Sequence, residues 1–161
     1  MNIVLYEPDI PGNTGNVGRT CLATGSTLHL VGKLGFSLDD THVKRSGLDY
    51  WEKVRVVKHK DWDAFLDSVG PKAALYFFSK KAEQDFWQAT FHPESYLIFG
   101  CETGGLPEAI HKRYADQFYR IPMAPASVRS LNLSTSVGVV LYEALRQTGV
   151  DLNGRIPSKT A

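Results

Sequence analysis

The sequence is poor in cysteine and has no long apolar run. Its two cysteines, Cys21 and Cys101, lie far apart and form no Cys-x-x-Cys pair, which argues against a disulfide framework or a cysteine-rich zinc site. No stretch approaches the ~20 apolar residues of a membrane span, and no basic segment typical of a secretion signal opens the chain. We therefore expect a cytoplasmic protein without a membrane segment.

The chain also lacks an excess of charge of either sign. Its 18 Lys and Arg nearly balance its 17 Asp and Glu, for a net charge of +1. This balance argues against an acidic tail or a histone-like basic arm. RNA binding stays open, because a nearly neutral protein can concentrate its Lys and Arg on one face.

The size of the chain, 161 residues of which 43% are hydrophobic, fits a single domain over residues 1–161. Short β-rich runs alternate with helical segments, which predicts a parallel α/β sheet covered by helices. We expect a weakly ordered tail at residues 150–161. The expected strands are Asn2–Tyr6, Thr27–Val31, Val54–Val57, Ala73–Phe78, Tyr96–Phe99 and Phe118–Ile121, and the expected helices are Thr14–Ala23, Trp62–Val69, Pro107–Tyr114 and Ser134–Gln147.

Three motifs contain more glycine and polar residues than a core needs. The first, Pro11–Arg19, follows the first expected strand with the spacing Gly-x-x-Gly-x-x-Gly. Glycines let a backbone approach a ligand and a helix start offers unpaired N–H groups, although a loop and helix cap explains this stretch equally well. We expect Arg19, one turn into the helix, to face the sheet edge where ligands bind.

The second motif, Leu97–Pro107, runs from a buried strand through a loop with three glycines into a helix. Loops at the carboxyl ends of parallel strands are where α/β proteins bind ligands, although Gly-Gly-Leu-Pro is also good turn chemistry.

The third motif comprises Ile121–Met123 and Val128–Gly138, and it opens the last expected helix. It holds more polar residues than helix capping requires. We favour a functional role for Arg129, Ser130 and Asn132. For Ser134 and Thr135, helix capping is at least as good an explanation as a functional role.

Taken in order, these motifs resemble those of the SPOUT methyltransferases, and most closely the TrmL-type tRNA (cytidine/uridine-34)-2′-O-methyltransferases. The resemblance covers nearly the whole chain. The chain departs from the family's pattern at Gly104, where relatives often carry a polar or charged residue, and in the variable loop 124–128. The matching segments are Ile3–Pro8, Asn13–Asn16 with Arg19, Arg45–Trp51, Phe99–Pro107, Arg120–Met123, Ser130–Ser134 and onward to Glu143.

The resemblance implies a parallel-sheet SPOUT fold with a C-terminal trefoil knot that holds S-adenosyl-L-methionine (SAM), and a homodimer whose two chains together build the active site. It implies SAM-dependent 2′-O-methylation of the wobble nucleotide, position 34, of tRNA, without a metal. The residues it assigns to SAM are Phe78, Gly100, Glu102, Ile121, Ser130 and Leu131. Its substrate-binding candidates are Asn13, Asn16, Arg45 and Arg129, and its catalytic candidates are Arg19, Asn132 and Tyr142.

Arg19 is the leading candidate for activating a ribose 2′-hydroxyl, which must lose its proton. Because a guanidinium stays protonated, we expect a charged Arg19 that binds phosphate and stabilises the developing alkoxide. None of the five histidines falls in the motifs, and we expect all of them to be surface or structural residues. The candidates for phosphate contacts are Lys44, Arg45, Lys80, Lys81, Arg129 and Arg155.

Three alternatives stay open. A Rossmann-type oxidoreductase needs Gly-x-Gly-x-x-Gly and an acidic residue after the second strand, and the chain has neither. A catalytically silent RNA-binding module would not need Arg19, Glu102 and the Ser130–Asn132 set together. Methylation of another tRNA position or of rRNA is the closest alternative, because SPOUT enzymes share these motifs.

Overall fold

A computed structural model describes residues 1–37, 50–125 and 128–152 of the chain. Its helices are α1 (Pro11–Ala23), α3 (Trp62–Val69), α4 (Glu108–Arg113) and α5 (Leu133–Thr148), with short 3-10 helices η1 (Trp51–Lys53), η2 (Phe86–Gln88) and η3 (Ala115–Gln117). Its strands are β1 (Asn2–Tyr6), β2 (Thr27–Val31), β3 (Val56–His59), β4 (Leu75–Phe78), β5 (Gln84–Asp85), β6 (Tyr96–Phe99) and β7 (Phe118–Arg120).

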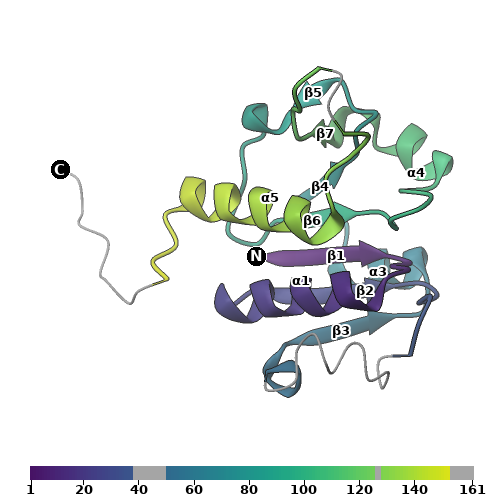
Figure 1. Cartoon of the computed structure of the whole chain (residues 1–161), viewed down its shortest axis with the longest axis vertical. Helices are drawn as coiled ribbons and strands as arrows, with labels where there is room; N and C mark the ends of the chain where they lie inside the picture. Colours follow the sequence, from purple (N-terminus) through teal and green to yellow (C-terminus); the bar gives the residue numbers. More distant parts are fainter. Residues whose placement is uncertain (38–49, 126–127, 153–161) are drawn as a thin grey trace.

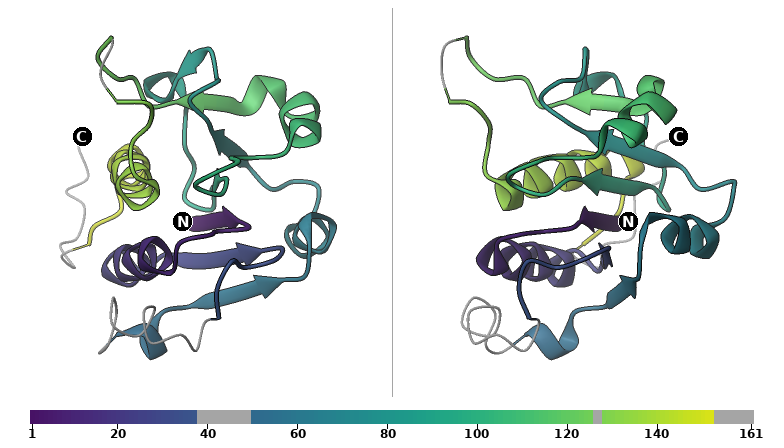
Figure 2. Two further views of the ribbon diagram at one scale, coloured as in Figure 1. Left: turned by 45° about the vertical axis from the view of Figure 1, so that its right-hand side comes forward. Right: turned by 90° about the vertical axis from the view of Figure 1, so that its right-hand side faces the viewer.

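The seven strands form one sheet in the order β3-β2-β1-β6-β4-β7-β5, and every neighbouring pair is parallel. This confirms the predicted α/β class. Helices α1 and α5 lie side by side on one face, and α3 and α4 lie on the other (Figures 1 and 2). The C-terminal knot stays a prediction. No helix in the described ranges is long and apolar enough to cross a membrane.

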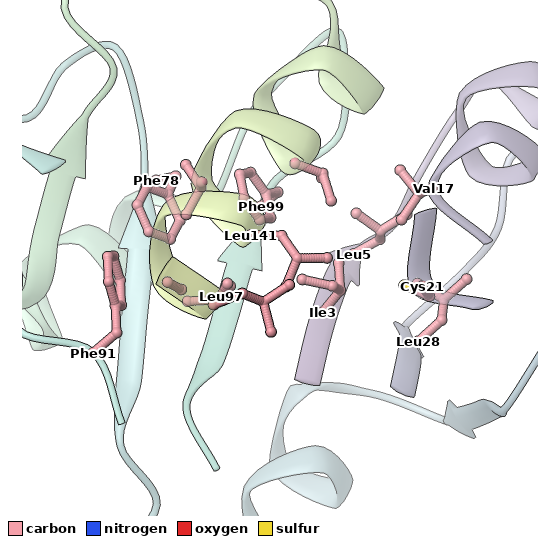
Figure 3. Close-up of a cluster of buried hydrophobic side chains, with 14 of the residues drawn as sticks. Ile3, Leu5, Val17, Cys21, Leu28, Phe78, Phe91, Leu97, Phe99 and Leu141 are labelled. Atoms are coloured by element: carbon pink, nitrogen blue, oxygen red, sulfur yellow. The ribbon is translucent and has the colours of Figure 1, made fainter. Parts of the chain in front are cut away.

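The side chains of the central strands alternate between the two faces. Ile3 and Leu5 of β1 join the core beneath α1 and α5, whereas Val4 joins the second core beneath α3 and α4. Figure 3 shows the first core, where Leu141 of α5 meets side chains of β1 and β6. Burial on both faces explains why these strands are continuous apolar runs.

Helix α1 begins at Pro11, three residues earlier than predicted, so the first glycine motif is a helix and not a ligand-binding loop. Proline suits the first helical position, because its missing N–H would have no intrahelical partner there. Gly18 is needed for packing: a Cβ on it would lie 2.5 Å from the ring of Trp51. The part of this motif that we expected as a loop, Pro11–Asn13, is therefore helical.

Other element boundaries also differ from the prediction by one or two residues, as in β4, β7, α4 and α5. Strand β3 begins at Val56, because Val54 closes the η1 turn by donating its N–H to the Trp51 carbonyl at 3.0 Å. Strand β5 was not predicted, because a strand of two residues is too short to show an alternation of apolar and polar side chains. Helix α5 ends at Thr148 and is capped by Gly149 in the left-handed conformation (φ 65°), and residues 153–161 of the tail lie outside the described ranges.

Two of the histidines have the structural role that we expected. His29 and His59 stack at 5.2 Å, and their Nδ1 and Nε2 atoms lie 2.9 Å apart. Burial, with His59 as a neighbour, lowers the pKa of His29 to about 4, so the pair is neutral at physiological pH.

Candidate active site

A cavity of about 570 Å³ lies at the carboxyl ends of β4, β6 and β7. Its wall consists of the loops that follow these strands, the first turns of α5, and Ile10 and Asn13 at the start of α1. The strand order reverses next to β6, since β1, β2 and β3 run outward on one side and β4 on the other. Such a switch point is where open parallel sheets bind ligands.

The loop after β6 folds back tightly on the end of its own strand. A Cβ on Gly100 would lie 2.2 Å from the carbonyl carbon of Gly105 and 2.4 Å from the nitrogen of Leu106. Gly105 has a φ of +70°, and Cys101 forms a β-bridge with it. Glycine at both positions therefore lets the loop close into a compact wall of the cavity.

A chain of hydrogen bonds joins three walls of the cavity. Glu102 accepts from the backbone N–H of Asp9 and from Nδ2 of Asn13, both at 2.8 Å. Asn13 accepts from Nδ2 of Asn132 at 2.9 Å. Asn132 also caps α5, where its Oδ1 accepts from the N–H of Ser134 at 2.9 Å. Both Glu102 oxygens are engaged within the protein, so Glu102 positions the loops that line the cavity.

The floor of the cavity is apolar and aromatic. Phe78 and Phe99 stack with ring centroids 4.9 Å apart and are almost fully buried in the first core. Phe78 therefore both packs in the core and lines the cavity. Together with Ile121, Leu131 and the flat backbone at Gly100, these surfaces suit a planar apolar group such as a nucleobase.

Cationic and titratable groups occupy one side of the cavity. Lys80 and Lys81 follow β4, and His111 lines the same side while stacking on Phe118 at 4.1 Å. Burial and the nearby Lys81 lower the pKa of His111, which favours its neutral form. His111 thus packs as a structural residue, as expected, and also contributes to the wall.

The structure brings eight of the predicted site residues together and leaves the others elsewhere. Arg129 lines a second, neighbouring cavity, and Asn16 and Tyr142 are exposed on α1 and α5. Arg45 lies outside the described residues, as do Lys44 and Arg155. The residues that line the first cavity are Asn13, Phe78, Gly100, Glu102, Ile121, Ser130, Leu131 and Asn132.

Arg19 is not part of the cavity wall of its own chain, contrary to our expectation. Because α1 starts at Pro11, Arg19 lies more than two turns into the helix, about 12 Å along its axis. Its guanidinium carbon lies 4.9 Å from the centre of the Tyr50 ring, and the side chain is exposed. A single chain does not bring this arginine to the cavity.

Several residues of the cavity were absent from the predicted site set. They include Ser79, Cys101, Thr103 and Met123, and also Lys80 and Lys81, which were considered only as general phosphate contacts. Most follow directly on strands whose ends were predicted correctly. The rule that ligands bind at the carboxyl ends of parallel strands would have found them.

Residues 1–142 match the SpoU rRNA methylase family. Two similar proteins are named tRNA (cytidine(34)-2'-O)-methyltransferase. One, from Burkholderia pseudomallei, is 47% identical over 153 residues, covering 94% of this chain and 97% of the relative. The other, from Escherichia coli K12, is 47% identical over 150 residues, covering 92% and 94%.

Two solved structures have the same fold. One is a structure that concerns the 2-OH methylation of C/U34 on tRNA. It has a TM-score of 0.86 and 45% sequence identity, and the match covers 96% of this chain and 97% of that chain. The other, the SpoU methyltransferase AviRb from Streptomyces viridochromogenes with bound AdoMet, has a TM-score of 0.81 and 27% identity over 91% of this chain and 57% of its own. The chain described here belongs to the SpoU rRNA methylase family.

Proposed function

We propose that this protein transfers a methyl group from SAM to the 2′-hydroxyl of the ribose at position 34 of tRNA. The observation that carries this proposal is the cavity at the carboxyl ends of β4, β6 and β7, in which three polar motifs far apart in sequence meet. Relatives that are 47% identical over nearly their whole length are named for this reaction, which supports the choice of nucleotide.

The residues of the cavity fit SAM. The apolar surfaces of Phe78, Ile121 and Leu131 suit the adenine ring, and the close packing of Gly105 and Leu106 against Gly100 keeps the neighbouring loop compact. When bound, SAM supplies an electrophilic methyl group on a sulfonium. The protein's own part is to align the ribose oxygen with that methyl group, because orientation supplies much of the rate of such a displacement.

Arg19 acts, in this proposal, at the active site of a second copy of the chain. Val139 and Tyr142 are exposed by 38% and 52% on the outer face of α5, which packs beside α1. A homodimer that covers these apolar side chains would carry Arg19, on the neighbouring helix, toward the partner. There its charged guanidinium binds the RNA phosphate and stabilises the negative charge that develops on the ribose oxygen as the hydroxyl proton passes to solvent water.

The test is transfer of labelled methyl groups from SAM to total tRNA, followed by mapping of the modified nucleotide. We expect label on the ribose of nucleotide 34, and a loss of turnover on the order of 10²–10³-fold in Arg19→Ala. Arg113→Ala is the matched control, since Arg113 is also an exposed arginine over a tyrosine ring, 5.3 Å from its centre. Arg19→Lys keeps the charge without the fork, so full turnover in that variant would contradict the geometric role.

Two other results would redirect the proposal. Label in rRNA or at another tRNA position would keep the chemistry and replace the substrate. Bound SAM without transfer to any RNA would leave only the cofactor site. For the dimer, Val139→Asp on α5 should shift sedimentation to the monomer and abolish transfer, whereas Val57→Asp, at an exposed apolar side chain on β3, should leave both unchanged.

A further inference from the structure

A second cavity, of about 390 Å³, adjoins the candidate active site. It shares the lining residues Lys80, Ile121 and Met123 with the first cavity, so the two cavities lie next to each other. Its volume lies at the low end of the range for small-molecule sites, which limits the occupant to a group about the size of one nucleotide. Its described lining residues are Lys80, Arg120, Ile121, Pro122, Met123, Ala124, Val128 and Arg129.

The charged side chains of this second cavity are all cationic. Lys80, Arg120 and Arg129 contribute to its wall, and no acidic residue of the described ranges does. By contrast, Glu102 in the first cavity accepts two hydrogen bonds from within the protein. The cationic side of the first cavity, at Lys80, therefore continues into the second one, and this charge favours an anion.

Arg120 is held in a defined orientation. Its Nε donates to Oδ1 of Asp85 at 2.7 Å, and the two side chains are 46% and 36% exposed. Asp85 is itself fixed, because it forms a capping box with Gln88 at the start of η2. Contact through Nε leaves the terminal nitrogens of the guanidinium to meet the two oxygens of a phosphate, the geometry for which arginine is best suited.

The remaining wall of the second cavity is apolar. Pro122, Met123 and Val128 contribute carbon surface, and Val128 is 63% exposed. A free phosphate would gain nothing from contact with such a surface. A nucleotide carries a charged phosphate together with the carbon surfaces of its sugar and base, so it can contact both parts of the wall. Cations and apolar side chains together therefore indicate a nucleotide of a single strand.

We propose that the second cavity binds the nucleotide of the RNA strand next to the one that is methylated, with Arg120 as ligand of the phosphate between them. The proposal rests on the proposed function, because it takes the first cavity as the place of methyl transfer. Arg129 contributes a second cation. Lys80, which borders both cavities, lies where the strand passes from one to the other.

The test uses an anticodon stem-loop RNA with neutral methylphosphonate at one or the other phosphate flanking the target nucleotide. In the wild-type protein, one of the two replacements should weaken RNA binding about 10-fold. Arg120→Ala should weaken binding of unmodified RNA by a similar factor, reduce the salt slope by about 1, and show no further loss with that methylphosphonate. SAM affinity, measured by calorimetry, should be unchanged.

Arg113→Ala serves as control and should keep the full methylphosphonate effect. Asp85→Asn removes the carboxylate that orients Arg120 without removing the guanidinium, so it should raise the KM for RNA less than Arg120→Ala does. Independent, multiplicative losses for Arg120→Ala and the methylphosphonate would overturn the proposal while leaving methyl transfer to tRNA standing. If the wild-type protein transferred no methyl group to tRNA, the proposed function and this inference would fail together.

Discussion

Gly100→Ala tests whether the loop after β6 forms the wall of a SAM site. The added Cβ would lie 2.2 Å and 2.4 Å from backbone atoms of Gly105 and Leu106. An ordinary van der Waals contact needs 3.4–4 Å, so the backbone must move by more than an ångström. Gly100 is not among the glycines with positive φ, so the predicted effect comes from lost space and not from backbone strain.

The magnitude follows from this collision. Overpacking of a tight site costs about 1–3 kcal/mol, and a backbone contact lies toward the upper end because no side chain can rotate away. A cost of about 1.4 kcal/mol corresponds to a tenfold change in affinity. We expect SAM to bind at least about 10-fold more weakly to Gly100→Ala, with a lowered midpoint of thermal unfolding.

The matched control is Gly104→Ala in the same loop. Its Cβ would meet only Sγ of Cys101, at 3.4 Å, so we expect little change in stability or SAM affinity. Titration calorimetry with SAM and thermal unfolding of both variants supply the assay. If Gly100→Ala bound SAM as tightly as Gly104→Ala, the loop would not form part of the cofactor site and the assignment would be refuted.

Three further predictions concern groups around the site and in the core. Glu102→Gln places an amide donor against the N–H of Asp9 or Nδ2 of Asn13, so it should weaken SAM binding in calorimetry by about 1–3 kcal/mol; unchanged affinity would contradict the positioning role. His29 titrates at about 4 when folded and near 6.5 when unfolded, so unfolding takes up protons between these values. The free energy of unfolding, measured with urea, should therefore fall by about 2 kcal/mol from pH 7.5 to pH 5, and a parallel fall in His29→Phe would refute this cause. Gly18→Ala must displace the Trp51 ring and should cost about 1–3 kcal/mol of stability; an unchanged melting temperature would show that the ring moves freely.

The sheet was predictable because its central strands are buried on both faces. Runs such as Asn2–Tyr6 and Tyr96–Phe99 are short, apolar and separated by turn residues, which leaves little choice of secondary structure. Strand β5 has only two residues and pairs with β7, far along the chain, so its sequence carries no signal of its own. Contacts made only in the folded protein define such an edge strand.

The start of α1 was missed because glycine has two opposite uses. Pro11, Gly12 and Asn13 were expected as a loop before the helix, whereas they form its first turn, and Gly18 further along serves close packing of that helix. The collision with Trp51, 33 positions away, is a tertiary contact that local sequence does not show. The same error misplaced Arg19, since an earlier helix start moves it away from the sheet edge.

The polar motifs lie in loops that meet at the cavity, and part of their polarity serves hydrogen bonds between those loops. Glu102 accepts from Asn13 across 89 positions of sequence, and Asn132 donates to Asn13 across 119. These bonds join the start of α1, the loop after β6 and the N-terminus of α5. Glu102 and Asn132, which suggested ligand binding, therefore also hold the walls of the cavity together. Arg120 and Arg129 line the second cavity and not the first, so substitutions at these two residues should separate RNA binding from SAM binding.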